Sequence, residues 1–421
     1  MLPMATLTLP DNAPEGTPPE RTAREDARLI GVVSTAHSIS HFSQLLLAPL
    51  FPWLKVAFGV SYTELGFLMT IFFVVSCVVQ TLSGFWVDRF GPRPILFGGL
   101  SLLGIAALGY ASAQSYAMLA AFSVVAGIGN GVFHPVDYTL LNRKVQKERL
   151  GHAYSAHGIS GSLGWALAPV LLVPITVAYS WRVALLCAAA LAFAVLVLLW
   201  FNRGALVLDK ARAPAAIAGG SAEGSLDFLR IPAVWMCFAF FFFFAGALSI
   251  IQTFGPTAAG KLHAVPPELA ALCLTVYMVC SAAGMLAGGF LVSDPARCER
   301  IVGLGFGAAA LVALVVGFST TLPALAVPVL FGLMGLATGS AGPSRDLLVK
   351  RSTPENASGR VFGVVYSGLD IGQAVIPLLI GTLMDHGAYR SVWLALALLQ
   401  GVLVVSAFNV RRARREVLVS A

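Results

Sequence analysis

Residues 181–202 read WRVALLCAAALAFAVLVLLWFN, with Arg182 as the one charged side chain in the stretch. About 20 apolar residues in a helix span a hydrocarbon core of roughly 30 Å, so this stretch predicts a transmembrane helix. Similar stretches follow one another along the chain. Twelve spans are predicted, at 29–54, 63–87, 94–111, 115–142, 152–178, 181–202, 231–256, 268–293, 300–318, 322–345, 357–384 and 389–410.

The composition agrees with these spans. The 421 residues are 57% hydrophobic and 11% charged, with a mean hydropathy of +0.83. This leaves too little polar surface for a water-soluble globule, so the lipid bilayer is an expected partner. Residues 1–28 are rich in Pro, Thr and charge, which predicts a disordered tail and no cleaved signal peptide.

Positive charge sorts to one side of the predicted spans. With both termini inside, all but four of the 27 Lys and Arg lie in cytoplasmic segments, and the exceptions are Lys55, Arg182, Lys261 and Arg390. This bias predicts an inner-membrane protein with cytoplasmic N and C termini. The net charge of +7 is then an orientation signal, and no nucleic-acid partner is expected.

An internal repeat divides the chain into two halves. A shift of 208 residues without gaps aligns Gln44 with Gln252, Gly131 with Gly339, Pro135 with Pro343, Gly164 with Gly372 and Pro169 with Pro377. We therefore predict two parallel-repeat six-helix halves, at 29–203 and 231–411. A cytoplasmic linker at 204–230 would join them, and 412–421 would form a basic tail. A solute path would lie between the halves.

The segment between the second and third spans reads GFWVDRFGPR, from Gly84 to Arg93. It resembles the signature loop of the major facilitator superfamily, although Pro92 and Pro94 interrupt the usual basic run. The resemblance implies a secondary transporter that works by alternating access, and we expect a functional monomer. It also implies a cytoplasmic gate formed by Gly84, Asp88, Arg89, Gly91 and Arg93. The alternative is that Arg89 and Arg93 are topology charges alone.

Two further segments resemble one branch of that superfamily, the fosmidomycin-resistance exporters. They are Ser40-His41 in the first span and Gly131-Val-Phe-His134-Pro135 in the fourth. The superfamily's antiporter branches carry a Gly-Pro pair in the fifth span, where this chain has Gly164 and Pro169 apart. Export of a drug or metabolite and uptake of a small organic anion therefore both stay open.

Polar side chains in the first span share one face. Ser34, His37, His41 and Gln44 follow spacings of three and four residues. An ionisable side chain inside the membrane is costly unless it has a partner or a function. His37 and His41 are therefore candidates for a substrate or proton pathway, with Gln44 beside them. The alternative is a histidine bonded to a neighbouring helix.

The fourth span repeats this arrangement with Asn130, His134 and Asp137. An alternative interpretation places Asp137 at the cytoplasmic boundary as a gate residue, because Arg143 follows it closely. The repeat aligns Asp137 with Arg345, and we predict that these opposite charges face each other across the cytoplasmic mouth.

The eleventh span carries Tyr366, Asp370 and Gln373 on one face. Asp370 lies near mid-span and is our candidate for a carboxylate that couples transport to protons. A buried pair with a donor in the eighth or tenth span is the alternative. In the fifth span His157 stands among Gly158, Gly161 and Gly164, where we predict helix packing for the glycines and function for the histidine.

Other function classes find little support. No GxxxxGK[ST] loop is present, so an ion gradient rather than ATP is expected to drive transport. No cysteine pair is spaced for zinc or redox chemistry, and no metal or cofactor is predicted. Glycines 127, 129 and 131 predict tight helix packing rather than a phosphate loop. The chain is not expected to be an enzyme, and a transporter-like membrane sensor is the alternative function.

Overall fold

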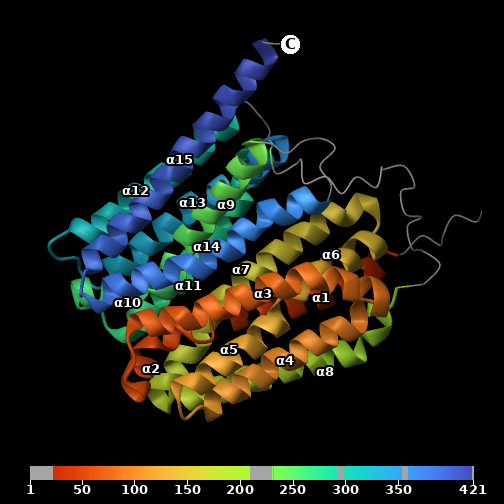
Figure 1. Ribbon diagram of the computed structural model, residues 1–421, viewed down its shortest axis with the longest axis horizontal. Helices are drawn as coiled ribbons and strands as arrows, with labels where there is room; N and C mark the ends of the chain where they lie inside the picture. The colour runs from red at the N-terminus through yellow and green to blue at the C-terminus, as the bar shows by residue number, and fades with distance from the viewer. Residues whose placement is uncertain (1–21, 209–229, 231, 292–296, 353–358, 420–421) are drawn as a thin grey trace, which may run out of the picture.

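Apolar stretches become helices here because a helix satisfies every backbone hydrogen bond of a single segment inside hydrocarbon. A computed structural model describes residues 22–208, 230, 232–291, 297–352 and 359–419. These residues are helices joined by short connections (Figure 1). The α-helices are α1 (Ala23–Gln44), α2 (Phe51–Phe58), α3 (Tyr62–Phe90), α4 (Pro92–Ser112), α5 (Tyr116–Asn130), α6 (Phe133–Lys144), α7 (Leu150–Ala178), α8 (Trp181–Phe201), α9 (Pro232–Thr253), α10 (Gly255–His263), α11 (Pro267–Leu291), α12 (Cys298–Phe318), α13 (Ala326–Ser352), α14 (Gly359–Asp385) and α15 (Tyr389–Val419). The short 3-10 helices are η1 (Ala48–Leu50), η2 (Lys147–Arg149) and η3 (Arg203–Leu206).

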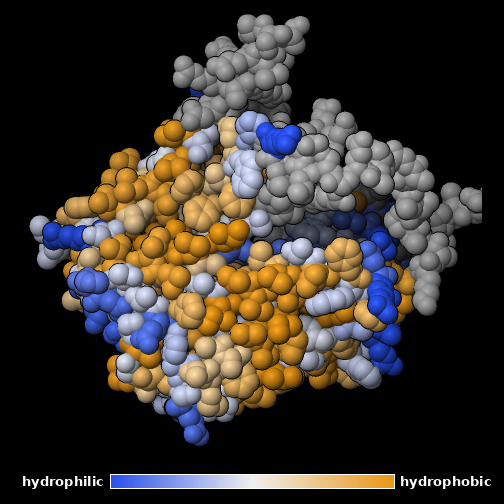
Figure 2. All heavy atoms as spheres, in the orientation of Figure 1, coloured by the Kyte–Doolittle hydropathy of each residue, from blue (hydrophilic) through white to orange (hydrophobic). Residues whose placement is uncertain are grey.

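The structure is that of a multi-span membrane protein. In the described residues, eleven helices are long and apolar enough to cross a membrane, with α5 and α6 counted as one span. Of the twelve predicted spans, the first is the one missing from this count. His37, His41 and Gln44 lower the hydropathy of α1. Figure 2 shows the same division on the surface, with a broad apolar band and hydrophilic residues gathered towards its ends.

Three predicted spans are interrupted. The span predicted at 29–54 ends as α1 at Gln44 and continues through η1 into α2, while the one at 231–256 is divided between α9 and α10. Prolines explain the new starts, since Pro49, Pro52 and Pro256 occupy first-turn positions where no N–H is needed. The span at 115–142 breaks between α5 and α6, just before Pro135.

The predicted boundaries of the tail and linker also shift. Residues 22–28, assigned to the tail, belong to α1 and its cap, because Thr22 and Glu25 form a capping box. Asp26 is fully buried and pairs with Arg149 at 2.8 Å. In the linker, η3 extends to Leu206, and α15 runs past 411 to Val419. Residues 1–21 and 209–229 lie outside the described part of the chain.

Two helix pairs join the halves. In the described residues α3 packs against α14, and α7 against α11. The first pair is closely packed, because a methyl group on Gly66 would meet the Pro377 carbonyl oxygen at 2.6 Å.

Glycines at equivalent positions of the repeat allow close helix packing in each half. A methyl group on Gly131 would overlap the Ser76 carbonyl of α3, and one on Gly339 would overlap the Ser281 carbonyl of α11. Methyl groups on Gly127 and Gly129 would likewise collide with the neighbouring backbones. The predicted packing function of these glycines is confirmed.

Candidate solute and ion sites

Four histidines surround one buried carboxylate in the first half. Asp137 of α6 is fully buried, and its Oδ2 lies 3.1 Å from Nε2 of His157 in α7 and 3.0 Å from Nδ1 of His37 in α1. The contact with His157 has the geometry of a hydrogen bond, whereas that with His37 is close but poorly directed. The interpretation of Asp137 as a boundary gate residue does not fit this burial.

The imidazole rings form a cluster beside this carboxylate. His37 lies over His157 with ring centroids 3.5 Å apart, and His41 and His134 follow at 4.4 and 5.2 Å from His37. Trp165 covers His41 at 4.2 Å. Close approach of α7 makes this possible, since a methyl group on Gly161 would lie 2.7 Å from the His41 ring. The packing predicted for Gly161 and Gly164 is confirmed, but Gly158 faces open space.

A neutral hydrogen-bond network lies beside the histidines. The Asn130 side chain accepts from Ser40 Oγ at 2.7 Å and from Gln44 Nε2 at 3.3 Å, and it donates to Ser76 Oγ at 2.8 Å. Trp165 Nε1 donates to Gln44 Oε1 at 2.9 Å. These bonds tie α1, α3, α5 and α7 together within the first half.

The second half places Asp370 at the contact between the halves. Nε2 of Gln80 in α3 lies 3.4 Å from an oxygen of Asp370 in α14. One helical turn along, Gln373 donates to Gln252 of α9 at 3.1 Å. The donor to Asp370 therefore comes from the second span, not from the eighth or tenth as the alternative predicted. Tyr366 lies in α14, but its side chain is outside the described part.

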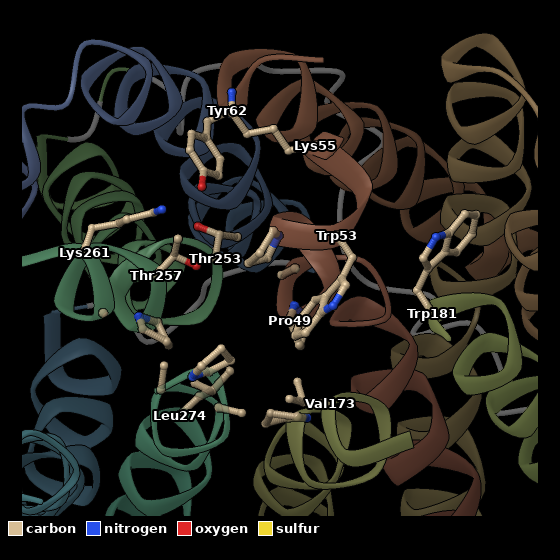
Figure 3. A pocket seen from close by; sticks show the side chains of 18 of the residues that line it. Pro49, Trp53, Lys55, Tyr62, Val173, Trp181, Thr253, Thr257, Lys261 and Leu274 are labelled. Atoms are coloured by element: carbon tan, nitrogen blue, oxygen red, sulfur yellow. The ribbon is translucent and has the colours of Figure 1, made fainter. Parts of the chain in front are cut away.

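A cavity of about 1070 Å³ lies between the halves at the end that holds Lys55 and Lys261 (Figure 3). Lining residues from the first half include Pro49, Trp53, Tyr62 and Val173, and those from the second include Thr253, Thr257 and Leu274. The wall is mostly apolar, with a few polar groups, as is common in small-molecule sites.

The cavity's two lysines differ in their surroundings. Lys55 Nζ lies 3.5 Å from an Asp385 oxygen and 4.5 Å from the centroid of the Tyr62 ring. Lys261 points towards the cavity in Figure 3 and makes no ion pair with a described residue. Gln252 also lines the cavity, and its buried amide nitrogen has no hydrogen-bond partner among the described residues. Lys261 thus offers a cation to a bound solute.

Asp385 of α14 holds the start of α3 at this end. Its oxygens accept from the backbone N–H groups of Tyr62 at 2.7 Å and Thr63 at 2.9 Å, and from Thr63 Oγ1 at 2.7 Å. A carboxylate at a helix N-terminus satisfies free N–H groups and meets the positive end of the helix dipole. The contact joins the two halves beside the cavity.

The predicted gate residues gather at the other end of α3. Asp88 pairs with Arg143 of α6 at 3.4 Å, while Arg89 lies over its neighbour Phe90. Gly91 ends the helix with φ of +83°, a conformation that favours glycine, and Gly84 and Arg93 lie nearby without a contact that ties them to Asp88. This pair lies within one half.

The predicted pair of Asp137 and Arg345 is not formed in this structure. Asp137 contacts His37 and His157, and the guanidinium of Arg345 lies 4.2 Å from the Phe244 ring of α9. Each charged group is engaged within its own half.

Several residues that contact these sites are not among the candidates predicted from the sequence. Three of them are polar residues on helices that also carry candidates: Gln80, Trp165 and Arg143. Their helical spacing from those candidates is the signal that could have identified them. In the sequence, Lys55 and Lys261 are exceptions to the charge bias, and Asp385 stands at the end of a span with no pattern that marks it.

Most of the chain also matches a known family model. The model described as Major Facilitator Superfamily matches residues 33–333 and 259–420. The chain belongs to the major facilitator superfamily. It is therefore a membrane transporter rather than an enzyme, as the signature-loop resemblance implied.

Relatives of this major facilitator protein include resistance proteins. The fosmidomycin resistance protein of Escherichia coli is 25% identical over 88% of this chain and 90% of its own length. A multidrug resistance protein B homolog of Mycobacterium tuberculosis is 28% identical, over 37% of this chain and 29% of its own.

Solved structures confirm the fold. A bacterial homolog of the human lysosomal transporter Spinster, in an inward-facing and occupied conformation, matches with a TM-score of 0.72 at 14% identity. It covers 93% of this major facilitator chain and 98% of its own. A mutant of the nucleoside transporter NupG matches with a TM-score of 0.70 at 13% identity, over 92% and 99%.

Proposed function

We propose that this transporter exports a small organic solute with an anionic or acceptor-rich group across a bacterial-type inner membrane, driven by protons. The observation that carries the proposal is the cavity between the halves, where Lys261 lies in a mostly apolar wall. Alternating access needs a site that both halves line, and this cavity meets that need. The charge bias supports an orientation with Lys55 and Lys261 outside.

The direction of transport is supported by the relatives. The one that aligns over most of this chain is named for resistance to fosmidomycin, and another is named for multidrug resistance. Resistance by a transporter requires net movement of the drug out of the cell. Uptake of an organic anion is the second candidate, because the cavity's lysines would attract such a solute from outside.

Coupling to protons is supported by the position of Asp370. A carboxylate at the contact between the halves can exchange a proton as that contact opens and closes. One charge that crosses 100 mV releases about 2.3 kcal/mol, roughly enough for a forty-fold solute gradient. The four histidines stay predicted members of the solute pathway.

Drug susceptibility tests this function. A fosmidomycin-sensitive bacterial strain expressing the chain should require at least about four-fold more fosmidomycin for growth inhibition than one with an empty vector. The Asp370→Asn variant, expressed at the same level, should give no protection. Greater sensitivity on expression would show uptake instead, and no change across a panel of carboxylates, phosphonates and lipophilic drugs would contradict export.

A further inference from the structure

The chain has seven histidines, and the fold gathers four of them in one place. His37 and His41 come from α1, His134 from α6 and His157 from α7, so no local sequence motif brings them together. A ring nitrogen from each of His37, His134 and His157 lies within 4.8 Å of the other two. Three imidazoles and a carboxylate at such spacing are the donor set of a transition-metal site.

The distances suit a tetrahedral ion. Bonds of about 2.0–2.1 Å to nitrogen and oxygen place neighbouring ligand atoms roughly 3.3 Å apart. Oδ2 of Asp137 already lies 3.0 Å from Nδ1 of His37 and 3.1 Å from Nε2 of His157. The ring nitrogens of His37, His134 and His157 lie within 4.8 Å of one another, and the stacked rings of His37 and His157 would have to turn for their lone pairs to converge on one ion.

Several buried polar atoms of the cluster lack a hydrogen-bond partner in the described part of the chain. Oδ1 of Asp137 and both ring nitrogens of His41 are buried and make no well-formed hydrogen bond with a described residue. Removing a charged carboxylate from water is costly, and the hydrogen bond from His157 reaches only one of its oxygens. A bound cation would compensate that charge, and His41 and Trp165 would close the site on one side.

The cluster is less covered on the opposite side. His134 is only half-buried, its neighbour Tyr138 is 43% exposed, and the space beside Gly158 is open.

We propose that His37, His134, His157 and Asp137 bind one divalent transition-metal ion, of which Zn²⁺ is the probe. Nitrogen donors disfavour Mg²⁺ and Ca²⁺, which prefer oxygen. All four ligands belong to α1, α6 and α7 of one half, so the ion would clamp that half without hindering its movement against the other. The proposal gives His37, His134 and His157 this function in place of one in the solute pathway, and it does not depend on which solute is carried.

Metal content tests the proposal. Protein purified with an affinity tag that lacks histidine is stripped with EDTA, equilibrated with micromolar ZnCl₂, desalted and analysed by mass spectrometry for zinc. The expected result is about one zinc per chain, falling below about 0.2 in His134→Asn and in His157→Ala. The exposed His386 lies at the far end of the other half, so His386→Ala should keep full content. Less than about 0.2 zinc in the unaltered protein would overturn the proposal, as would full retention in both cluster variants.

X-ray absorption spectroscopy tests the site in the unaltered zinc-loaded protein. This measurement does not require that any variant folds. The expected spectrum shows three imidazole nitrogens and one oxygen at about 2.0–2.1 Å. A sulfur ligand, or coordination by oxygen alone, would place the zinc elsewhere and overturn the assignment.

Discussion

Gln80 of α3 and Asp370 of α14 meet across the contact between the two halves, with Nε2 of Gln80 3.4 Å from the carboxylate. The same helix pair is packed tightly towards its other end, where Gly66 lies against the Pro377 carbonyl. A carboxylate at this contact must change its surroundings whenever the halves move. In the proposed function, Asp370 is the group through which a proton gradient acts on the conformation.

The Asp370→Asn variant should separate binding from coupling. The amide keeps the size of the side chain but carries no exchangeable charge. We expect solute exchange across vesicles to persist, while accumulation driven by a proton gradient falls to background. Glu148 is exposed and far from the halves' contact, so Glu148→Gln should accumulate solute normally. Loss of both activities in Asp370→Asn would show a structural or solute-binding function instead.

Lys261 should determine affinity for anionic solutes. A hydrogen bond to a charged group contributes about 1.5–3 kcal/mol, so Lys261→Ala should raise KM roughly 10- to 100-fold with a smaller effect on kcat. Lys261→Arg should recover most of the affinity. The measurement is the concentration dependence of transport, and an unchanged KM for an anionic solute would exclude contact with Lys261.

Asp385→Ala should loosen the closed contact beside the cavity. The change removes three hydrogen-bond acceptor contacts to Tyr62 and Thr63 and the ion pair with Lys55. We expect a cysteine at position 257, in the cavity wall, to react with a water-soluble maleimide roughly 10-fold faster.

Glu64→Ala provides a matched control for this experiment. It breaks the cap that Glu64 forms with Ser61 on the same helix but no contact with the other half. Equal acceleration in both variants would attribute the effect to fraying of α3 rather than to the contact between the halves.

Gly164→Ala should destabilise the first half. The added methyl group would overlap the Ser38 carbonyl of α1, and overpacking of this kind costs about 1–3 kcal/mol. Gly151 begins the same helix with open space around it, so Gly151→Ala should leave stability nearly unchanged. The measurement is the thermal unfolding midpoint in detergent, and equal midpoints for the two variants would contradict the packing.

The sequence predicted most of the fold because membrane spans follow from local hydropathy. The aligned glycines predicted the repeat, since backbone approach tolerates no side chain at Gly131 or Gly339. The interruptions after Gln44 and Thr253 were missed because apolar residues continue beyond both points. Hydropathy measures transfer to lipid and does not register where a helix ends.

The sequence predicted which candidate residues share a face of one helix, but not which faces of different helices meet. Helical spacing placed His37 with His41, and His134 with Asp137, on shared faces. That His157 stacks on His37 depends on the distance between α1 and α7, which Gly161 and Gly164 set and which periodicity in one helix does not contain. The expected pair of Asp137 and Arg345 failed for the same reason, because alignment of repeats does not give contact across them.

Solute-triggered proton release from energised inside-out vesicles tests proton-coupled export most directly. A pH-sensitive dye reports the gradient while fosmidomycin and then other anionic drugs are added. The account predicts that a solute collapses the gradient in vesicles with the unaltered protein, and not in those with Asp370→Asn. An unchanged gradient with every solute, in vesicles shown to contain folded protein, would contradict it.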